Sequence, residues 1–184
     1  MNRAERRKIF YVYDSFTASD APVNKPREHR ELYGNMAKQS PHFSVAPGKV
    51  DDPITGGQIE IGYRFYEGAA TGAVMIGQPP DCEAFTKLFD WPDVVMPGQP
   101  DGSDLEILLT ELDSDPERVS AISRRNAVEA LSRHDWVYRW KQMFRVLGLE
   151  PSPSMARREQ RLKELADLAF DPHDLSCMSA SHDF

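Results

Sequence analysis

Short apolar runs alternate with longer amphipathic stretches along this chain of 184 residues. The runs are rich in β-branched and aromatic residues and end at Pro, Gly, Ser or Asp, a pattern typical of strands. The stretches between them carry apolar residues three or four positions apart, as in helices with one buried face. We therefore expect strands at residues 8–13, 41–46, 73–77 and 93–96, with helices between them.

This order of elements predicts the fold class. Strands that alternate with helices form parallel sheets through right-handed crossovers, so we expect an α/β, Rossmann-like parallel sheet of about four strands with flanking helices. Residues 1–149 should form this domain, and residues 150–184 a C-terminal helix with a disordered tail. The expected helices are 26–39, 81–89, 103–112, 114–133, 135–147 and 154–170.

Particular side chains predict where these helices begin and which faces they bury. Ser103, with Glu106 three residues on, predicts a capping box. Leu32 and Met36 are expected to face the core from the first helix. Further packing is expected from aromatic and apolar residues: Phe89 and Trp91 between helix and sheet, His134 as a capping or core residue, and Trp136, Trp140, Phe144 and Leu147 on one packed face.

A predicted helix at residues 58–71 organises the rest of the chain. With about 100° per residue, a narrow polar stripe runs along it between small, apolar and aromatic residues. The preceding Gly56-Gly57 turn would leave backbone N–H groups free near the helix N-terminus, where anions bind. The alternative is a solvated face on which the charged residues pair with one another, beside an ordinary turn. The stripe consists of Glu60, Arg64, Glu67 and Thr71.

Composition excludes several classes of protein. With 40% hydrophobic and 28% charged residues, the chain is typical of a soluble globular protein. A net charge of −7 gives no indication of a general nucleic-acid or membrane-surface binder. Cys82 and Cys177 are far apart and show no metal-ligand spacing, which favours a reducing, cytoplasmic location. No apolar stretch is long enough to cross a bilayer, and no Gly-x-Gly-x-x-Gly or Walker phosphate loop is present.

An ordered set of motifs runs along much of the chain. It begins with the segment 64–76, RFYEGAATGAVMI, and continues through Phe89–Asp93, Asp115–Arg118 and His134–Trp136 to Arg139. This set resembles the group 1 type glycosyltransferases of GT-B fold, and the segment 64–76 looks like their glutamate-helix-glycine-strand signature. The resemblance is to the C-terminal half of these enzymes, which binds the nucleotide-sugar donor.

The resemblance implies roles for particular residues. Glu67 matches the second glutamate of the family's Glu-x7-Glu element, which implies ribose recognition; the first would fall at Ile59, next to Glu60. Arg64 matches the arginine of an Arg-Phe-Glu-like core motif found in one branch of this family, which implies contact with the diphosphate or with Glu67. The resulting expectation is Glu60 and Arg64 as catalytic residues and Thr55, Gly56, Gly57, Glu67, Thr71 and Lys49 as donor-binding residues, with no metal and no cofactor besides the donor.

The length of the chain leaves room for one of the two lobes of a GT-B enzyme. The expected function is therefore the donor-binding half of a glycosyltransferase, which needs a second lobe, a partner or another copy of itself for transfer. One alternative is a non-catalytic interaction or nucleotide-binding module that keeps the fold. A weaker alternative is a flavodoxin-like regulator, for which Asp14 and Asp20 would supply acidic residues at strand ends.

Overall fold

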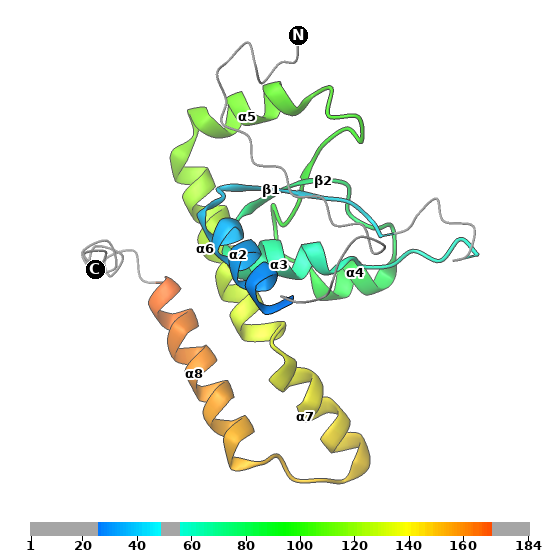
Figure 1. The fold of residues 1–184 in the computed structure, drawn as a ribbon, viewed down its shortest axis with the longest axis vertical. Coiled ribbons are helices and arrows are strands. Elements are labelled where there is room, and N and C mark those ends of the chain that lie inside the picture. The colour runs from blue at the N-terminus through cyan, green and yellow to red at the C-terminus, as the bar shows by residue number, and fades with distance from the viewer. Residues whose placement is uncertain (1–25, 49–55, 171–184) are drawn as a thin grey trace. The chain divides into compact units, whose positions relative to one another are not determined.

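The computed structural model describes residues 26–48 and 56–170 (Figure 1). The chain divides into two units, Met1–Gly34 and Asn35–Phe184, and the first described helix is α2 (Pro26–Gln39). The larger unit contains the sheet. The expected strand at 8–13 and the expected tail from 171 lie outside the described residues, and the expected boundary at 149 stays a prediction.

The sheet is parallel, as the sequence predicts. Its three described strands are β1 (His42–Val45), β2 (Val74–Gly77) and β3 (Met96–Pro97), in the order β1-β2-β3. His42 lies opposite Val74, and Ile76 opposite Met96. The third strand is shorter than expected, because Asp93 adopts a positive φ of 58° and the chain turns before it pairs with β2.

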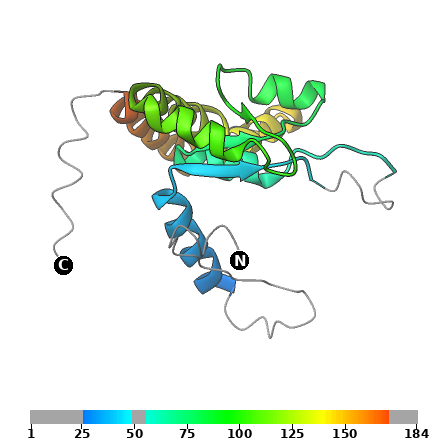
Figure 2. The ribbon, with the colours of Figure 1, turned by 90° about the horizontal axis from the view of Figure 1, so that it is seen from above.

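Helices connect and extend these strands, which confirms the α/β class. Among them, α6 begins after Asp115, whose carboxylate accepts a hydrogen bond from the Arg118 amide, and α7 after Asp135, which caps the Val137 amide in the same way. Helix α8 packs along α6 (Figure 2). The helices after β1 are α3 (Tyr63–Thr71), α4 (Glu83–Leu88), α5 (Leu105–Ser114), α6 (Pro116–Arg133), α7 (Trp136–Leu147) and α8 (Pro153–Phe170).

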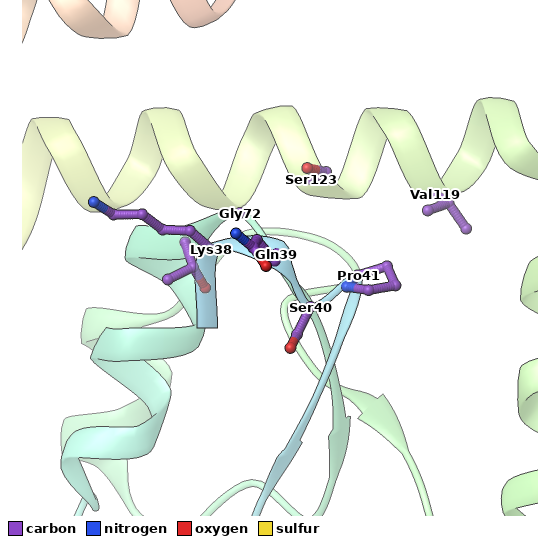
Figure 3. A pocket seen from close by; sticks show the side chains of 8 residues that line it. Lys38, Gln39, Ser40, Pro41, Gly72, Val119 and Ser123 are labelled. Carbon is purple, nitrogen blue, oxygen red and sulfur yellow. The ribbon is translucent and has the colours of Figure 1, made fainter. Parts of the chain in front are cut away.

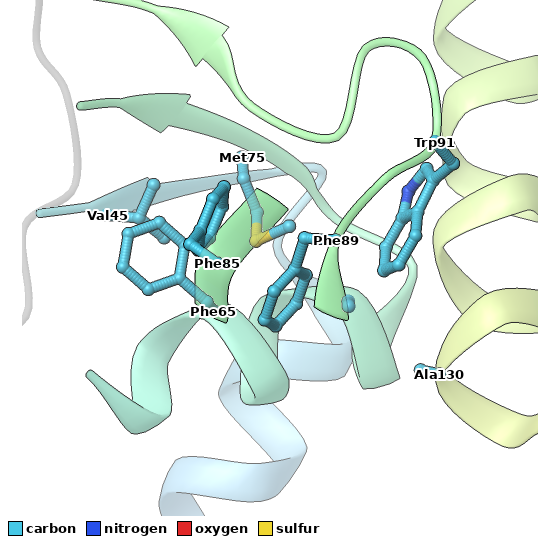
Figure 4. Close-up of a cluster of buried hydrophobic side chains, with 8 residues drawn as sticks. Val45, Phe65, Met75, Phe85, Phe89, Trp91 and Ala130 are labelled. Carbon is cyan, nitrogen blue, oxygen red and sulfur yellow. The ribbon is translucent and has the colours of Figure 1, made fainter. Parts of the chain in front are cut away.

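Strand β2 lies between two hydrophobic layers, because its successive side chains point to opposite faces. Met75 points toward α3 and α4, where Phe65, Phe85 and Phe89 pack around it (Figure 4). Val74 and Ile76 point to the other face, where they pack with residues of α5 and α6. Figure 1 shows α3 and α4 on one side of the sheet and α5 on the other.

Two buried polar contacts join these layers. Asn126 of α6 is fully buried; its side-chain amide donates to the Ala73 carbonyl at 2.8 Å, and its oxygen accepts from the Trp91 indole at 2.8 Å. Trp91 and Phe89 are buried between helix and sheet, as expected from the sequence. The side chain of Asn126 thus ties α6 to the start of β2 and to the connection before β3.

The central prediction, a helix over 58–71, is wrong at its beginning. Helix α3 starts at Tyr63, and residues 58–62 are not helical. Instead, the Gly48 amide donates to the Glu60 carbonyl at 3.2 Å in an antiparallel bridge. Gly56 and Gly57, with φ of 59° and 82°, form a turn well before the helix. Pairing with a distant segment therefore overrides the helical spacing of Glu60.

Three other expectations are also wrong. The helix after β3 begins at Leu105 with Asp104 at its N-cap, and the Asp104 carboxylate accepts from the Gln99 amide, so Ser103 and Glu106 form no capping box. Leu32 and Met36 are exposed, and among residues 31–39, the part of α2 whose burial is described, Ala37 is the buried one. The expected packed face of α7 is also largely exposed, with Trp136, Trp140 and Leu147 at 73%, 50% and 68%.

Candidate functional site

The carboxyl ends of β1 and β2 meet the beginning of α3 at one edge of the sheet. An alanine methyl built on Gly62 would lie 3.6 Å from the Ala46 carbonyl, just beyond the end of β1. The Gln78 amide, just beyond β2, donates to the Val45 carbonyl at 3.3 Å. In open parallel sheets, ligands bind outside the carboxyl ends of the strands. This edge is therefore the candidate site.

The N-terminus of α3 is open at this edge. Its N-cap residue is Gly62, which makes no side-chain hydrogen bond to the helix, and its first turn holds no acidic residue. The first amides of an α-helix have no partner within the helix, and together they carry a partial positive charge. The beginning of α3 can accordingly receive an anion through the backbone N–H groups of its first turn.

Arg64 and Glu67 stand side by side on α3. Their side chains pair at 3.5 Å, with exposed fractions of 45% and 35%. The Arg64 guanidinium also lies over the rings of Phe43 and Tyr63, 5.9 and 5.7 Å from their centres, which limits its orientations. Burial raises the pKa of Glu67, and the neighbouring Arg64 opposes that shift. The expected pairing of these two residues is thus present, and both remain accessible to a ligand.

The structure places the other predicted site residues in several different places. Glu60 is not on α3, but the Gly48–Glu60 bridge holds it close to the same edge of the sheet. Gly56 and Gly57 are exposed in their turn and lie apart in sequence from the helix start. Thr55 and Lys49 lie outside the described residues.

Thr71 lies at the far end of α3. Its hydroxyl is within hydrogen-bond distance of the Glu67 and Gly68 carbonyls, at 3.1 and 3.0 Å. Seven residues of helix separate it from Arg64, which corresponds to about 10 Å along the axis. Thr71 is on the same stripe as Arg64 and Glu67 but does not join them at the carboxyl edge.

Thr71 instead lines an open pocket of about 430 Å³ at the opposite edge (Figure 3). There the Val74 amide, at the start of β2, donates to the Pro41 carbonyl, just before β1. The pocket lies between the end of α2, the end of α3 and helix α6. Its lining residues are Lys38, Gln39, Ser40, Pro41, Thr71, Gly72, Val119 and Ser123.

The comparisons with known proteins bear on the larger unit. A family model described as "Glycosyl transferase-like" matches residues 24–145, more than half of the chain. The chain belongs to this glycosyl transferase-like family. No curated protein and no solved structure matches it. The match includes the sheet and helices α3 to α6, and it confirms the resemblance stated from the motifs at the level of family.

The residues that carry the resemblance have distinct places in this glycosyl transferase-like domain. The longest motif forms most of α3 and nearly all of β2, and brings Arg64 and Glu67 to the candidate site. Gly72 ends α3 at a φ of 70°, and its amide donates to the Ala69 carbonyl. Sequence reasoning missed Gly62, whose signal was its position directly before a helical run, since glycine is accepted at N-caps.

His134 ends α6 on the side of α3 away from the charged pair. Its ring packs against Tyr66, Phe89 and Trp91, with ring centres 4.8 to 5.8 Å apart. Burial, together with the charges of Arg133 and Arg139, lowers the pKa of His134 to about 4, and the backbone of Leu88 opposes the shift. This confirms a core and capping residue and excludes His134 from the site at the carboxyl edge.

His134 should make the folding stability of this protein sensitive to acid. The unfolded chain binds a proton on this ring near pH 6.5 and the folded chain only near pH 4, so stability is complete above pH 6.5 and falls as the pH decreases through that interval. We expect His134→Phe to reduce the loss of unfolding free energy between pH 7.5 and pH 5, measured by urea titration. An equal loss in both proteins would assign the acid sensitivity to other groups.

The described residues contain no helix long and apolar enough to cross a membrane, and no group of His, Cys, Asp or Glu arranged to hold a metal ion.

Proposed function

We propose that this domain binds a nucleoside-diphosphate sugar at the carboxyl edge of its sheet and acts as the donor half of a glycosyltransferase. The observation that carries the proposal is the meeting of the uncapped α3 N-terminus with the Arg64–Glu67 pair at that edge. Membership of a glycosyl transferase-like family supports the same reading.

The chemistry of a sugar nucleotide fits these groups. The backbone amides at Tyr63 and Arg64, together with the Arg64 guanidinium, suit the diphosphate, because guanidinium groups and helix N-termini both bind phosphate oxygens. The Glu67 carboxylate suits the two ribose hydroxyls, which donate hydrogen bonds to its oxygens.

Transfer of the sugar requires the departing diphosphate to be stabilised as its charge grows. The same amides and Arg64 would do this, since oriented donors and cations stabilise charge that develops in the transition state. Under this proposal, Glu60, which the bridge to Gly48 holds near the same edge, would accept hydrogen bonds from sugar hydroxyls. By this proposal, the acceptor is held by a second lobe, whether on the same polypeptide, a second copy or a partner.

Thermal unfolding with uridine, guanosine and adenosine diphosphates tests donor binding. A ligand present at 100 times its Kd stabilises the folded state by about 2.7 kcal/mol. For a chain of this size, that raises Tm by roughly 5–10 °C. We expect one of the three nucleotides to produce such a shift. If none of them changes Tm, the chain does not bind a nucleotide donor and the proposal is wrong.

Glu67→Ala and a matched control separate the site from general effects of charge. Removing a hydrogen bond to a charged group costs about 1.5–3 kcal/mol, so Glu67→Ala should weaken binding by roughly tenfold or more. Glu83 is an exposed glutamate of α4 that also pairs with a cation on its own helix, Lys87. Glu83→Ala should leave the nucleotide Kd, measured by titration calorimetry, unchanged. An equal weakening by both substitutions would count against a role for Glu67.

A further inference from the structure

Helix α7 exposes an apolar stripe along its length. Trp136, Trp140, Met143 and Leu147 are 73%, 50%, 41% and 68% exposed. On a helix with about 100° per residue, these four side chains fall within an arc of about 60°. Val137, on another side of the helix, is the buried residue of α7. Large apolar side chains that gather on one exposed face mark an interaction surface more often than scattered ones do.

The helix extends away from the sheet as one arm of a hairpin. Helix α8 is the described element against which α7 chiefly packs, and the two are joined at the end far from the sheet (Figure 1). Lys141 pairs with Glu159 between the arms, and Arg158 pairs with Asp135 at 2.7 Å. These contacts hold the hairpin together without covering the apolar stripe.

The hairpin is basic although the chain is acidic. Residues 136–170, which include both helices, contain seven Lys and Arg against four Asp and Glu, a charge of +3, whereas the whole chain has −7. Arg145 and Arg157 are exposed, and within the described part of the chain neither forms a salt bridge. The net charge of the whole chain is therefore the sum of a basic hairpin and an acidic remainder. For this reason it gave no indication of a membrane-surface binder.

We propose that the α7–α8 hairpin, residues 136–170, is a docking surface for a bilayer that contains anionic phospholipids. A helix with Trp and aliphatic residues on one face and Lys or Arg on another lies in the plane of a membrane interface. Trp136 and Trp140 suit the headgroup boundary, where one part of the ring system is apolar and the other is wet. Arg145 and Arg157 provide the attraction to lipid phosphates.

The charge and the apolar residues together favour a lipid surface over two other occupants. A second copy of the chain, in a two-fold dimer through this surface, would bring two hairpins of charge +3 together. A nucleic acid would attract the arginines and could stack on Trp, but it offers no apolar volume to Met143 and Leu147. An anionic bilayer satisfies both the charge and the stripe.

Vesicle binding by the full chain tests this proposal. We expect co-sedimentation with vesicles of phosphatidylcholine and roughly one third phosphatidylglycerol, at least about tenfold stronger than with phosphatidylcholine alone. Two of the chain's three tryptophans lie on the stripe, and the third, Trp91, is buried. Tryptophan emission should consequently shift to shorter wavelength on binding, and high salt should weaken binding through screening.

Substitutions on the hairpin give the matched comparison. Trp136→Ser with Trp140→Ser should weaken binding about tenfold or more, because two large apolar side chains no longer leave water. Arg145→Glu with Arg157→Glu should weaken binding to the anionic vesicles without reducing binding to neutral ones. The control Ile107→Ser alters an apolar residue of α5 that is 63% exposed. It should change binding neither to anionic nor to neutral vesicles. All five side chains are exposed, so the Tm of each variant should stay near that of the wild type.

Four outcomes would overturn the proposal. They are no binding to anionic vesicles, equal binding to neutral and anionic vesicles, binding to an oligonucleotide but not to vesicles, and a dimer in sedimentation velocity that the Trp140→Ser variant abolishes. The last would assign the stripe to contact between copies of the chain. None of these results depends on whether a nucleotide binds at the sheet edge.

Discussion

Replacing Gly77 with alanine is expected to prevent stable folding of the larger unit. Gly77 ends β2 with a φ of 148°, and an added Cβ would lie 1.9 Å from the Val45 carbonyl oxygen of β1. That oxygen cannot move away without losing the hydrogen bond it accepts from the Gln78 amide. We expect a loss of more than about 4 kcal/mol, measured by urea unfolding followed by circular dichroism.

Two other glycines provide the comparison for Gly77. A methyl on Gly68 would lie 2.8 Å from Met75 Cγ and Sδ, which belong to a flexible side chain, so Gly68→Ala should cost about 1–3 kcal/mol. A methyl on Gly34, within α2, would meet nothing within 4 Å, and alanine there should stabilise the helix by about 0.5–1 kcal/mol. A Gly77→Ala protein as stable as the Gly34→Ala protein would show that β1 and β2 can separate at their carboxyl ends.

This effect of Gly77 concerns the candidate site as well as the core. The residue lets the ends of β1 and β2 approach each other at the edge where α3 begins. A change there should therefore alter nucleotide binding even in a fraction of protein that remains folded. Gly68, by contrast, lies within α3 and packs toward Met75, away from that edge.

Local signals predicted much of this fold. The expected helices 114–133 and 135–147 correspond closely to α6 and α7. Asp115 caps the first and Gly148, at a φ of 67°, ends the second, and such signals depend only on neighbouring residues. The runs 41–46 and 73–77 predicted β1 and β2 since buried parallel strands are continuous apolar segments.

The errors come from contacts between distant segments. The helical spacing of Glu60 with Arg64 could not show that the Gly48 amide donates to the Glu60 carbonyl, or that the helix begins only at Tyr63. Likewise, the apolar pattern of α7 predicted a buried face. Whether a partner within the chain covers such a face depends on tertiary packing, which periodicity does not contain.

The sequence predicted only part of the candidate site, because contacts between distant segments again decide the rest. Arg64 and Glu67, three residues apart, pair on α3 because i and i+3 residues of a helix are neighbours. Thr71 is on the same side of α3 as these two residues. It is at the C-terminal end of the helix, however, and therefore lies at the other edge of the sheet. The role of Gly62 at the N-cap became visible only once the beginning of the helix was known.

Replacing Asn126 with leucine should produce the second large loss of stability. The substitution keeps a similar volume but leaves the Trp91 indole N–H and the Ala73 carbonyl buried without their present partners. Each unsatisfied buried group costs about 1–3 kcal/mol, so the expected total is roughly 2–5 kcal/mol. For a chain of this size, the corresponding decrease in Tm, measured by calorimetry, is about 5–15 °C.

Trp91→Phe and a double-mutant cycle separate the two hydrogen bonds of Asn126. The single change Trp91→Phe removes the indole donor, so Asn126 loses one partner and keeps the Ala73 carbonyl. In the protein with Trp91→Phe and Asn126→Leu, no indole is left unsatisfied, and the combined loss should be smaller than the two separate losses added together. Strict additivity would mean that the indole finds another acceptor. In that case, Asn126 stabilises the domain through its bond to Ala73 at the start of β2. This bond then acts together with the packing of Val74 and Ile76 to hold α6 to the strand whose far end forms the candidate site.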